Sequence, residues 1–317
     1  MWTHVPLFAF DIWSDGRASA VQDNAPTGPG TYRWFHFDLS DTSLRDWSLA
    51  HLPELAANAL VHSETRPRCD PLGDGVILNL RGANLNPGQP IDQMVSIRMW
   101  VTGQTVVTVR LRKVFALDDI RAACVQNAAP ASADAFVSTL VGGLATRVRD
   151  VMLDAETQTE VLEDALEGDP ELETTEIART RRKAIRLLRY LNPQREALGN
   201  LLALDTGLFS ESNNLVLREH ANLFDLTGEA LEALKHRLEA LQAEADTQAA
   251  KRIGRNSYVL SLVAAVFLPL GFLTGLFGVN VAGMPGIDWP GAFFVLSAAM
   301  VLVGLGCILV LRWLRLL

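Results

Sequence analysis

Two long uncharged runs near the C-terminus constrain the fold of this chain more than any other feature. Ser257–Val281 and Ala292–Leu311 contain no Asp, Glu, Lys or Arg. An α-helix rises 1.5 Å per residue, so ~20 residues cross the ~30 Å hydrocarbon core of a bilayer. The alternative, buried helices of a soluble protein, fits poorly with two such runs joined by a short loop. We therefore expect the lipid bilayer as a partner and transmembrane helices at 257–279 and 291–312.

The flanking charges predict the orientation of both helices. Three bases lie in Lys251–Arg255 before the first run, and Arg312 and Arg315 follow the second. The loop between the runs has no Lys or Arg, and loops rich in these residues stay in the cytoplasm. We therefore expect both termini in the cytoplasm, an outer loop at 280–290 and a basic tail at 313–317.

Charge divides the chain into two regions. Residues 1–246 hold 35 of the 36 acidic and 23 of the 28 basic residues, a net charge of −12, whereas residues 247–317 carry +4. The mean hydropathy is nevertheless positive, at +0.16. This composition excludes a disordered chain, a disulfide-stapled miniprotein and a generally basic nucleic-acid binder. We expect an acidic soluble body, a basic apolar tail and no nucleic-acid partner.

Residues 1–214 are predicted to form a cytosolic α/β domain that ends in a helical hairpin. Thr102-Gly103 is typical of a β-hairpin turn between two alternating runs. The acidic arm, Asp150–Glu176, carries eleven acids, and the basic arm, Arg179–Arg189, carries six bases. These charges either face water, pair across the hairpin or form a regulatory cation site. The predicted strands are Tyr32–Leu39, Gly75–Arg81, Met94–Val101 and Gln104–Arg110, and the predicted helices before the hairpin are Leu44–Leu60 and Val114–Val125.

Leu215–Phe277 is predicted to be one long helix, because its only proline is Pro269. Its cytosolic part, residues 215–256, forms a stalk that continues into the first transmembrane helix. An apolar stripe with helical spacing runs along it: Leu231, Leu234, Leu238, Leu241 and Ala245. A second, mostly acidic row lies on the same helix face as Ser257, Ser261 and Leu268 when each residue turns the helix by about 100°. Its members are Asp225, Glu229, Glu232, His236, Glu239 and Asp246. If the membrane part of that face lines a pore, this row attracts cations in a funnel below it; the alternative is that it faces bulk water.

The end of the first run carries a specific motif. Phe267–Asn280 resembles the pore helix and signature of the CorA superfamily of divalent-cation channels. Magnesium members usually end this helix in Gly-Met-Asn, whereas Gly278-Val279-Asn280 is similar to the bacterial zinc transporter branch, the ZntB type. The stretches Thr65–Arg68 and Leu80–Asn86 also look like that branch.

The resemblance implies a funnel-shaped homopentamer with one pore in the bacterial inner (plasma) membrane. Gly278, Val279 and Asn280 would form the outer mouth and contribute to selectivity. Two positions depart from the family pattern: Gly286 replaces the acidic residue after Met-Pro of magnesium channels, and Ala243 replaces a usually acidic metal-binding residue. The residues that match pore-lining positions are Leu268, Gly271, Leu260 and Ser257, and Ser261 lies in the same helical row.

The chemistry of the first span predicts passage of a hydrated ion. The span has no carboxylate, His or Cys to replace a hydration shell, and a bare ion there would be very costly. The amide of Asn280 can hydrogen-bond the waters of a hydrated ion. Leu268 and Leu260 either form apolar constrictions that close by dewetting or pack against lipid and helices.

A weak metal site is predicted in the funnel. His236 lies between Glu232 and Glu239 on one helix face, and five copies would form a ring that binds zinc transiently. The alternative is a structural or solvated histidine. Asp288, the only acid of the tail, either concentrates cations at the outer mouth or caps the second span.

We therefore expect a zinc transporter, with zinc uptake coupled to protons as the resemblance implies. The transported ion is the substrate: Zn²⁺, with other divalent cations as the alternative. No cofactor is expected. The alternatives are a magnesium, cobalt or nickel channel of the same fold, zinc efflux, and a membrane-anchored sensor without a pore. An enzyme is not expected, because the sequence has no Walker motif, phosphate loop or nucleophile elbow.

Overall fold

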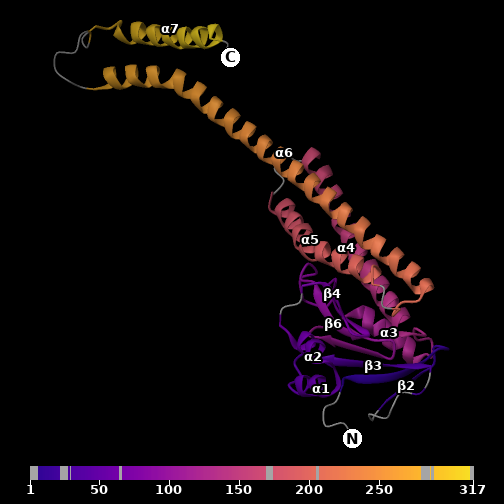
Figure 1. Cartoon of the computed structure of the whole chain (residues 1–317). Helices are drawn as coiled ribbons and strands as arrows, with labels where there is room; N and C mark the ends of the chain where they lie inside the picture. Colours follow the sequence, from indigo (N-terminus) through magenta and orange to yellow (C-terminus); the bar gives the residue numbers. More distant parts are fainter. Residues whose placement is uncertain are drawn as a thin grey trace. The chain divides into compact units, whose positions relative to one another are not determined.

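A computed structural model of the chain forms two compact units, Met1–Ala243 and Glu244–Leu317. Helix α6, Glu211–Gly278, contributes residues to both units (Figure 1). The structure describes residues 6–21, 28, 30–63, 66–168, 174–204, 207–279, 286 and 289–314.

The first unit contains a mixed seven-stranded sheet in the order β2-β1-β3-β7-β6-β5-β4. Neighbouring strands are antiparallel except β3 and β7, which run parallel. The hairpin predicted at Thr102-Gly103 is confirmed, since it joins β6 to β7. The strands are β1 (Phe8–Trp13), β2 (Ala18–Ala20), β3 (Thr31–Asp38), β4 (Arg68–Leu72), β5 (Gly75–Gly82), β6 (Val95–Val101) and β7 (Thr105–Arg110).

Three of these strands, β1, β2 and β4, were not predicted. Asp11 breaks the apolar pattern of β1, but it lies directly opposite Arg33 of β3 and accepts a hydrogen bond from Arg33 Nε at 2.6 Å. Strand β4 contains Pro71 and lies at the edge of the sheet, where a missing N–H is tolerated. The sequences of β1 and β4 do not resemble strands. The ion pair across to β3 allows the strand β1, and the edge position allows the strand β4.

Two short helices, α1 (Leu44–His51) and α2 (Glu54–Val61), cover one face of the sheet. The prediction of a single helix over Leu44–Leu60 is wrong, because Leu52 is extended, with φ −126° and ψ 159°. The residue before a proline is driven out of the helical region by the proline ring, and Pro53 follows here. The break lets both helices pack apolar sides against the sheet.

The opposite face is covered by α3 (Phe115–Val125) and α4 (Ala133–Gly168), and α3 confirms the predicted helix at this place. Trp34 of β3 packs edge-on against Phe136 of α4, with ring centroids 4.8 Å apart. Its indole N–H donates to Thr108 Oγ1 at 2.8 Å, so the buried ring has its polar atom satisfied.

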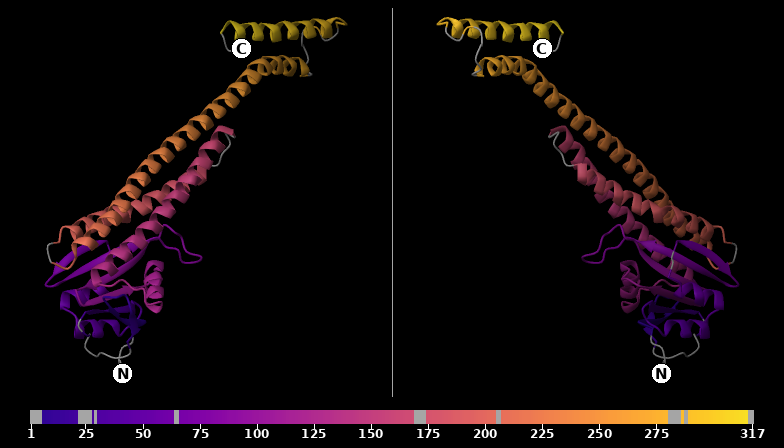
Figure 2. Two further views of the ribbon diagram at one scale, coloured as in Figure 1. Left: turned by 90° about the vertical axis from the view of Figure 1, so that its right-hand side faces the viewer. Right: turned by 90° about the vertical axis from the view of Figure 1, so that its left-hand side faces the viewer.

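Helices α4, α5 (Thr174–Leu202) and the first part of α6 pack as a three-helix layer (Figure 2). The predicted helical hairpin is confirmed, with α4 ending at Gly168 and α5 running back antiparallel to it. Helix α6 then runs parallel to α4. Ion pairs join all three helices: Lys183 to Asp154 at 3.0 Å, Arg195 to Asp225 at 2.5 Å and Arg237 to Glu163 at 2.7 Å.

The long helix predicted over Leu215–Phe277 is present as α6, which has 68 residues. All five residues of its predicted apolar stripe are buried, with exposed fractions of 7% or less. Their helical spacing therefore marks the face of α6 that packs inside the protein.

The second unit consists of the C-terminal part of α6 and of α7 (Ala292–Trp313). Figures 1 and 2 show α7 lying beside the end of α6 and running back in the opposite direction. This unit carries the residues predicted to line a pore.

Candidate functional site

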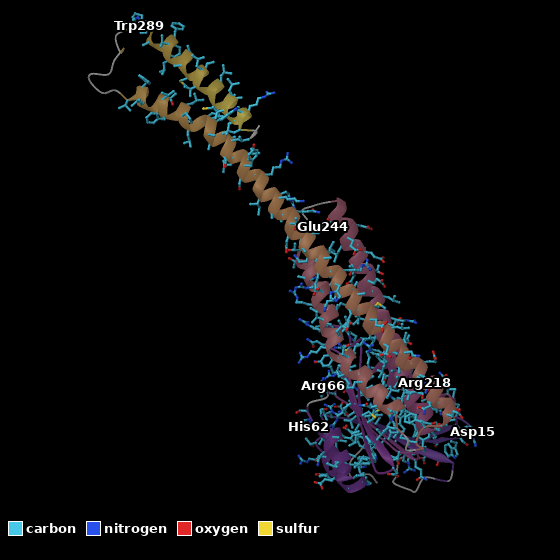
Figure 3. The ribbon with its side chains drawn as sticks, turned by 45° about the horizontal axis from the view of Figure 1, so that its top comes forward. Asp15, His62, Arg66, Arg218, Glu244 and Trp289 are labelled. Atoms are coloured by element: carbon cyan, nitrogen blue, oxygen red, sulfur yellow. The ribbon has the colours of Figure 1, made fainter. Side chains whose placement is uncertain are left out.

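Among the described residues, two helices are long and apolar enough to cross a membrane, α6 through its C-terminal part and α7. The apolar part of α6 has no buried residue in the single chain, so a solvent other than water or further protein must cover it. Trp289 precedes α7 (Figure 3) and Trp313 ends it, positions suited to the two aromatic belts of a bilayer.

Helix α7 packs on one side of the apolar part of α6. A Cβ at Gly304 of α7 would lie 4.0 Å from Leu270 Cδ1, so the glycine permits close approach. Six residues in this part of α6 are half-buried. With about 100° of rotation per residue, five of them cluster roughly 140° around the helix from Leu268, on the side of α7. The sixth, Ala264, lies nearer Leu268. The five are Leu262, Val266, Pro269, Leu270 and Leu273.

The predicted pore-lining residues lie on the other side of α6. Leu268 and Leu260 are 71% and 70% exposed, and Ser257, Ser261 and Gly271 are also exposed. Ser261 Oγ donates to the carbonyl oxygen of Ser257 at 2.8 Å, so its hydroxyl proton is used within the helix. The serine therefore presents lone pairs outward, which can accept hydrogen bonds from water on a hydrated ion.

The predicted outer mouth is only partly described. Gly278 ends α6 and Val279 follows it, 52% exposed. Asn280 and Asp288 lie outside the described residues.

The acidic row of α6 is mostly exposed in the single chain. Glu229, Glu232, Glu239 and Asp246 are exposed, as is His236, whose Nδ1 lies 3.3 Å from Glu239 Oε2. Asp225 differs from the other members of the row, because it is half-buried and ion-paired with Arg195 of α5 at 2.5 Å. Arg195 therefore offsets the charge of Asp225, whose side chain is 47% exposed.

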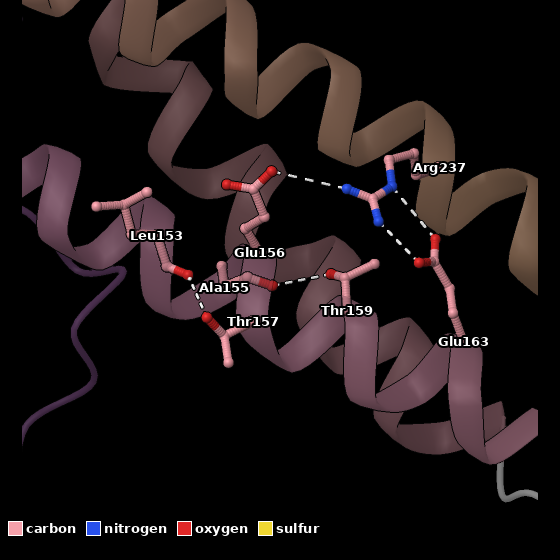
Figure 4. A network of polar contacts seen from close by, with 7 residues as sticks. All are labelled: Leu153, Ala155, Glu156, Thr157, Thr159, Glu163 and Arg237. Atoms are coloured by element: carbon pink, nitrogen blue, oxygen red, sulfur yellow. Dashed lines mark hydrogen bonds and ion pairs between the residues drawn. The ribbon is translucent and has the colours of Figure 1, made fainter.

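Arg237 is a charged residue of α6 whose role was not predicted. Its Nη2 donates to Glu163 Oε2 at 2.7 Å, and its Nη1 lies 3.7 Å from Glu156 Oε1, both on α4 (Figure 4). The hydrogen bond to Glu163, more than the charges around it, raises the pKa of Arg237 above its ordinary value. The acidic arm therefore forms ion pairs with α6 as well as with the basic arm. The many carboxylates of this arm were visible in the sequence, but nothing in the sequence identified Arg237 as their partner.

A buried carboxylate, Asp134, joins the start of α4 to the start of α6. Its Oδ2 accepts from Ser210 N at 2.9 Å, Ser210 Oγ at 2.8 Å and Asn213 Nδ2 at 2.8 Å, and its Oδ1 accepts from Ser132 Oγ. Burial alone would raise the pKa of Asp134, but these hydrogen bonds outweigh it and lower the pKa to about 2. The ionised side chain of Asp134 therefore holds the first turn of α6.

Within the described part of the chain, no group of three or more His, Cys, Asp or Glu side chains is arranged to hold a metal ion. Glu232, His236 and Glu239 therefore form no complete site in one chain. The predicted ring requires copies of His236 from several subunits, a geometry that a single chain does not contain.

Sequence comparisons connect the chain to known transporters. A family model described as CorA-like Mg²⁺ transporter protein matches residues 29–313. The zinc transport protein ZntB of Pectobacterium carotovorum is 31% identical over 272 residues, which cover 85% of this chain and 83% of the relative. The divalent cation transporter CmaX of Pseudomonas aeruginosa is 32% identical over 276 residues, which cover 86% and 82%.

Solved structures have the same architecture. The full-length CmaX protein superimposes with a TM-score of 0.86 at 29% identity and covers 98% of both chains. The CorA magnesium transporter from Methanocaldococcus jannaschii has a TM-score of 0.78 at 13% identity, covering 97% of this chain and 98% of that one, and shows the fold alone. The predicted N-terminal α/β domain, long helix and C-terminal apolar helix are thereby confirmed.

Proposed function

This chain belongs to the family of CorA-like Mg²⁺ transporter proteins, and on that premise we propose that it carries divalent metal cations through a central pore. The family and the relatives above are named as transporters, so the protein is not an enzyme. The ion is the transported substrate.

Zinc is the proposed physiological ion, taken up together with protons. The name of the relative from Pectobacterium supports zinc, and proton coupling follows only from the resemblance noted in the sequence. A broader divalent-cation channel for magnesium, cobalt or nickel is the second candidate, because the family is described by Mg²⁺ and CmaX by divalent cations.

The proposed assembly is a homopentamer of the inner membrane with both termini in the cytoplasm. In each subunit, residues 1–214 form the cytosolic domain, 215–256 the stalk, 257–279 the pore helix and 291–312 the second span. The loop 280–290 faces the periplasm, and 313–317 form the cytoplasmic tail. The positive charges that flank the spans support this orientation.

The observation that carries this proposal is the division of α6 into two sides. One side packs against α7, and the row from Ser257 to Gly271 lies on the other, exposed side. If five subunits pack with these rows inward, serine oxygens and leucine side chains line the path, and the ion keeps its water. Leu268 and Leu260 then close the pore by excluding water, and the amide of Asn280 contacts the hydrated ion at the mouth.

The deciding experiment is uptake of zinc and of magnesium into proteoliposomes that contain the full chain, with and without a pH gradient. We expect zinc uptake that increases with an inward proton gradient. Failure of every divalent ion to cross rejects transport, magnesium uptake without zinc uptake rejects the zinc assignment, and zinc uptake that is independent of the gradient rejects proton coupling.

Two variants test the path itself. Leu268→Ser should raise the resting flux several-fold because it hydrates the proposed constriction, whereas Leu302→Ser, on the exposed surface of α7, should leave flux unchanged. Asn280→Ala should alter selectivity or flux, and a variant with both intact would remove the role proposed for that amide.

A further inference from the structure

A cluster of basic residues lies where the two proposed spans end on the cytoplasmic side. Helix α7 runs back beside the end of α6 (Figures 1 and 2), so the residues that precede one span and follow the other lie at neighbouring levels. The sequence has no Asp or Glu at 247–279 or at 289–314, so no carboxylate of these stretches offsets the positive charge. The cluster consists of Lys251, Arg252 and Arg255 of α6 and Arg312 of α7.

The close approach of Gly304 on α7 to Leu270 on α6 sets the level of Arg312. Because the helices are antiparallel, each step after Gly304 corresponds to a step before Leu270. Arg312 therefore lies about seven residues from Arg255 along the helix axis, or about 10 Å at 1.5 Å per residue. Leu311, directly before Arg312, is 8% exposed and is the only buried residue of α7, so this end of the helix is packed.

The three basic residues of α6 lie on the side of that helix that faces α7. With about 100° of rotation per residue, Arg255 lies about 140° around the helix from Leu268, at the centre of the face that packs against α7. Lys251 and Arg252 lie at about 100° and 200°. The exposed row from Ser257 to Gly271 is on the other side, so in the proposed assembly these cations point away from the ion path. Positive charge on the row itself would repel the transported ion.

Two exposed aromatic side chains mark the depth of this cluster. Tyr258 of α6 is 41% exposed, and Trp313 of α7 is 83% exposed. Tyrosine and tryptophan gather at the boundary between lipid and water, where the ring is in apolar surroundings and the polar atom meets water. Tyr258 lies three residues after Arg255, and Trp313 directly follows Arg312. Both guanidinium groups are therefore at the level of the lipid headgroups.

We propose that this cluster binds the headgroup of an anionic phospholipid, such as phosphatidylglycerol, in the cytoplasmic leaflet. Arg255 and Arg312 donate hydrogen bonds to the phosphate oxygens from two different helices, and Lys251 and Arg252 add positive charge beside them. The lipid connects the cytoplasmic end of α7 to the base of the pore helix. The inference rests on the proposed placement of both spans in the membrane and is independent of which ion is transported.

The surroundings of the cluster favour a lipid over a soluble anion. The cluster adjoins two helices that are apolar enough to cross a membrane, and the apolar part of α6 has no buried residue in the single chain. The acyl chains of a phospholipid cover such a surface while its phosphate meets the arginines. A free phosphate ion gains nothing from the apolar surface, and a zwitterionic lipid brings its own positive charge to the cluster.

The test uses the fluorescence of Trp313, which brominated acyl chains quench on contact. The full chain carrying Trp289→Phe is reconstituted in phosphatidylcholine vesicles that contain a small fraction of brominated phosphatidylglycerol or, separately, of brominated phosphatidylcholine. All other tryptophans belong to the first unit, so Trp313 is the reporter in the tail. We expect half-maximal quenching at a several-fold lower fraction of brominated phosphatidylglycerol than of brominated phosphatidylcholine.

Three double variants identify the residues responsible. Arg255→Gln with Arg312→Gln should raise the fraction of brominated phosphatidylglycerol that is needed by about tenfold or more, as expected for two basic residues near a membrane surface. Arg255→Lys with Arg312→Lys keeps the charge and should lose much less. Arg45→Gln with Arg218→Gln removes the same charge from exposed positions of the first unit and should leave the quenching unchanged.

The proposal is overturned if brominated phosphatidylglycerol quenches Trp313 no better than brominated phosphatidylcholine. It is also overturned if the two glutamine double variants behave alike, or if the lysine double variant loses as much as Arg255→Gln with Arg312→Gln. Loss of the preference on adding millimolar inorganic phosphate would assign the cluster to a soluble anion and overturn the lipid. Uptake of zinc and magnesium in the same vesicles tests the proposed function separately, since a lipid preference without uptake rejects transport and leaves the lipid site in place.

Discussion

Single residues hold the start of α6 in place. Asp134 gathers donors from residues more than seventy positions away, and nearby Gly142 leaves room for the His220 ring. A Cβ at Gly142 would lie only 2.6 Å from His220 Nε2. Both contacts connect α4 to the first turns of α6, so small changes there should affect the anchoring of the whole helix.

Asp134 should make stability depend on pH in the acid range. Its pKa is about 2 in the folded chain against an ordinary 3.8, so its contribution is complete above pH ~4 and is lost as the pH falls through 2. Asp134→Asn should therefore lower the free energy of unfolding by roughly 1–2 kcal/mol at neutral pH, and by much less at pH 2. Unfolding followed by tryptophan fluorescence across this range measures the difference, and parallel pH profiles would contradict it.

Gly142→Ala should destabilise the first unit by roughly 1–3 kcal/mol, because the added methyl group displaces the His220 ring. Gly199→Ala is the matched control: its Cβ would meet no atom within 4 Å, and alanine is the better helix former. Thermal unfolding of both variants, and of Gly142→Ala combined with His220→Ala, checks this. If the second substitution restored no stability, the clash would not be the cause.

At the scale of elements, α6 makes three different contacts along its length. Its buried leucine stripe packs inside the first unit, Arg237 reaches the carboxylates of α4, and its C-terminal part contacts α7. In the described part of the acidic arm, Asp154 pairs with Lys183 of the basic arm, and Glu156 and Glu163 pair with Arg237 of α6. The hairpin therefore owes its stability mainly to its apolar side, since exposed ion pairs contribute little.

Arg237→Gln should loosen α6 from α4. It leaves Glu156 and Glu163 without their shared cation, and we expect a loss of about 1 kcal/mol, the value for a partly exposed bidentate pair. Hydrogen exchange of backbone amides around position 237 should become faster. Arg149→Gln, an exposed arginine of α4 whose nearest carboxylate is 3.8 Å away, should change neither quantity; equal effects would remove the special role of Arg237.

At the scale of the whole molecule, the acidic body is suited to water and the apolar tail to lipid. The net charge of the body is −12, and the exposed row on α6 places some of these charges on the element that continues into the membrane. In the proposed homopentamer every residue of this row is repeated five times, so a modest charge on one chain becomes a strongly negative ring that concentrates cations.

Neutralising two members of the row should slow cation uptake. We expect Glu232→Gln with Glu239→Gln to reduce the initial rate in proteoliposomes several-fold at low ionic strength, and the difference to shrink at high salt because exposed charges are screened. The control double variant, Asp46→Asn with Glu54→Gln, removes the same charge from α1 and α2. If both double variants behaved alike, net charge would matter and the row would not.

The candidate site could be predicted only in part. The spacing of the leucine stripe was sufficient to predict a buried face of α6, because burial repeats with the helical period. The same wheel placed Asp225 in the exposed row, yet Asp225 forms an ion pair with Arg195 of α5. A helical wheel contains no information about which neighbouring helix supplies a partner.

By itself the sequence determined the properties that depend on neighbours along the chain: two apolar spans, one long helix, its buried stripe, and the motif that ends at Asn280. These follow from the helical period and from the cost of charge in a bilayer. Only the tertiary structure decided the edge position of β4, the donors on Asp134 and the carboxylates that Arg237 contacts. The physical reason is that such contacts depend on which surfaces meet when distant segments pack, and no local pattern records this.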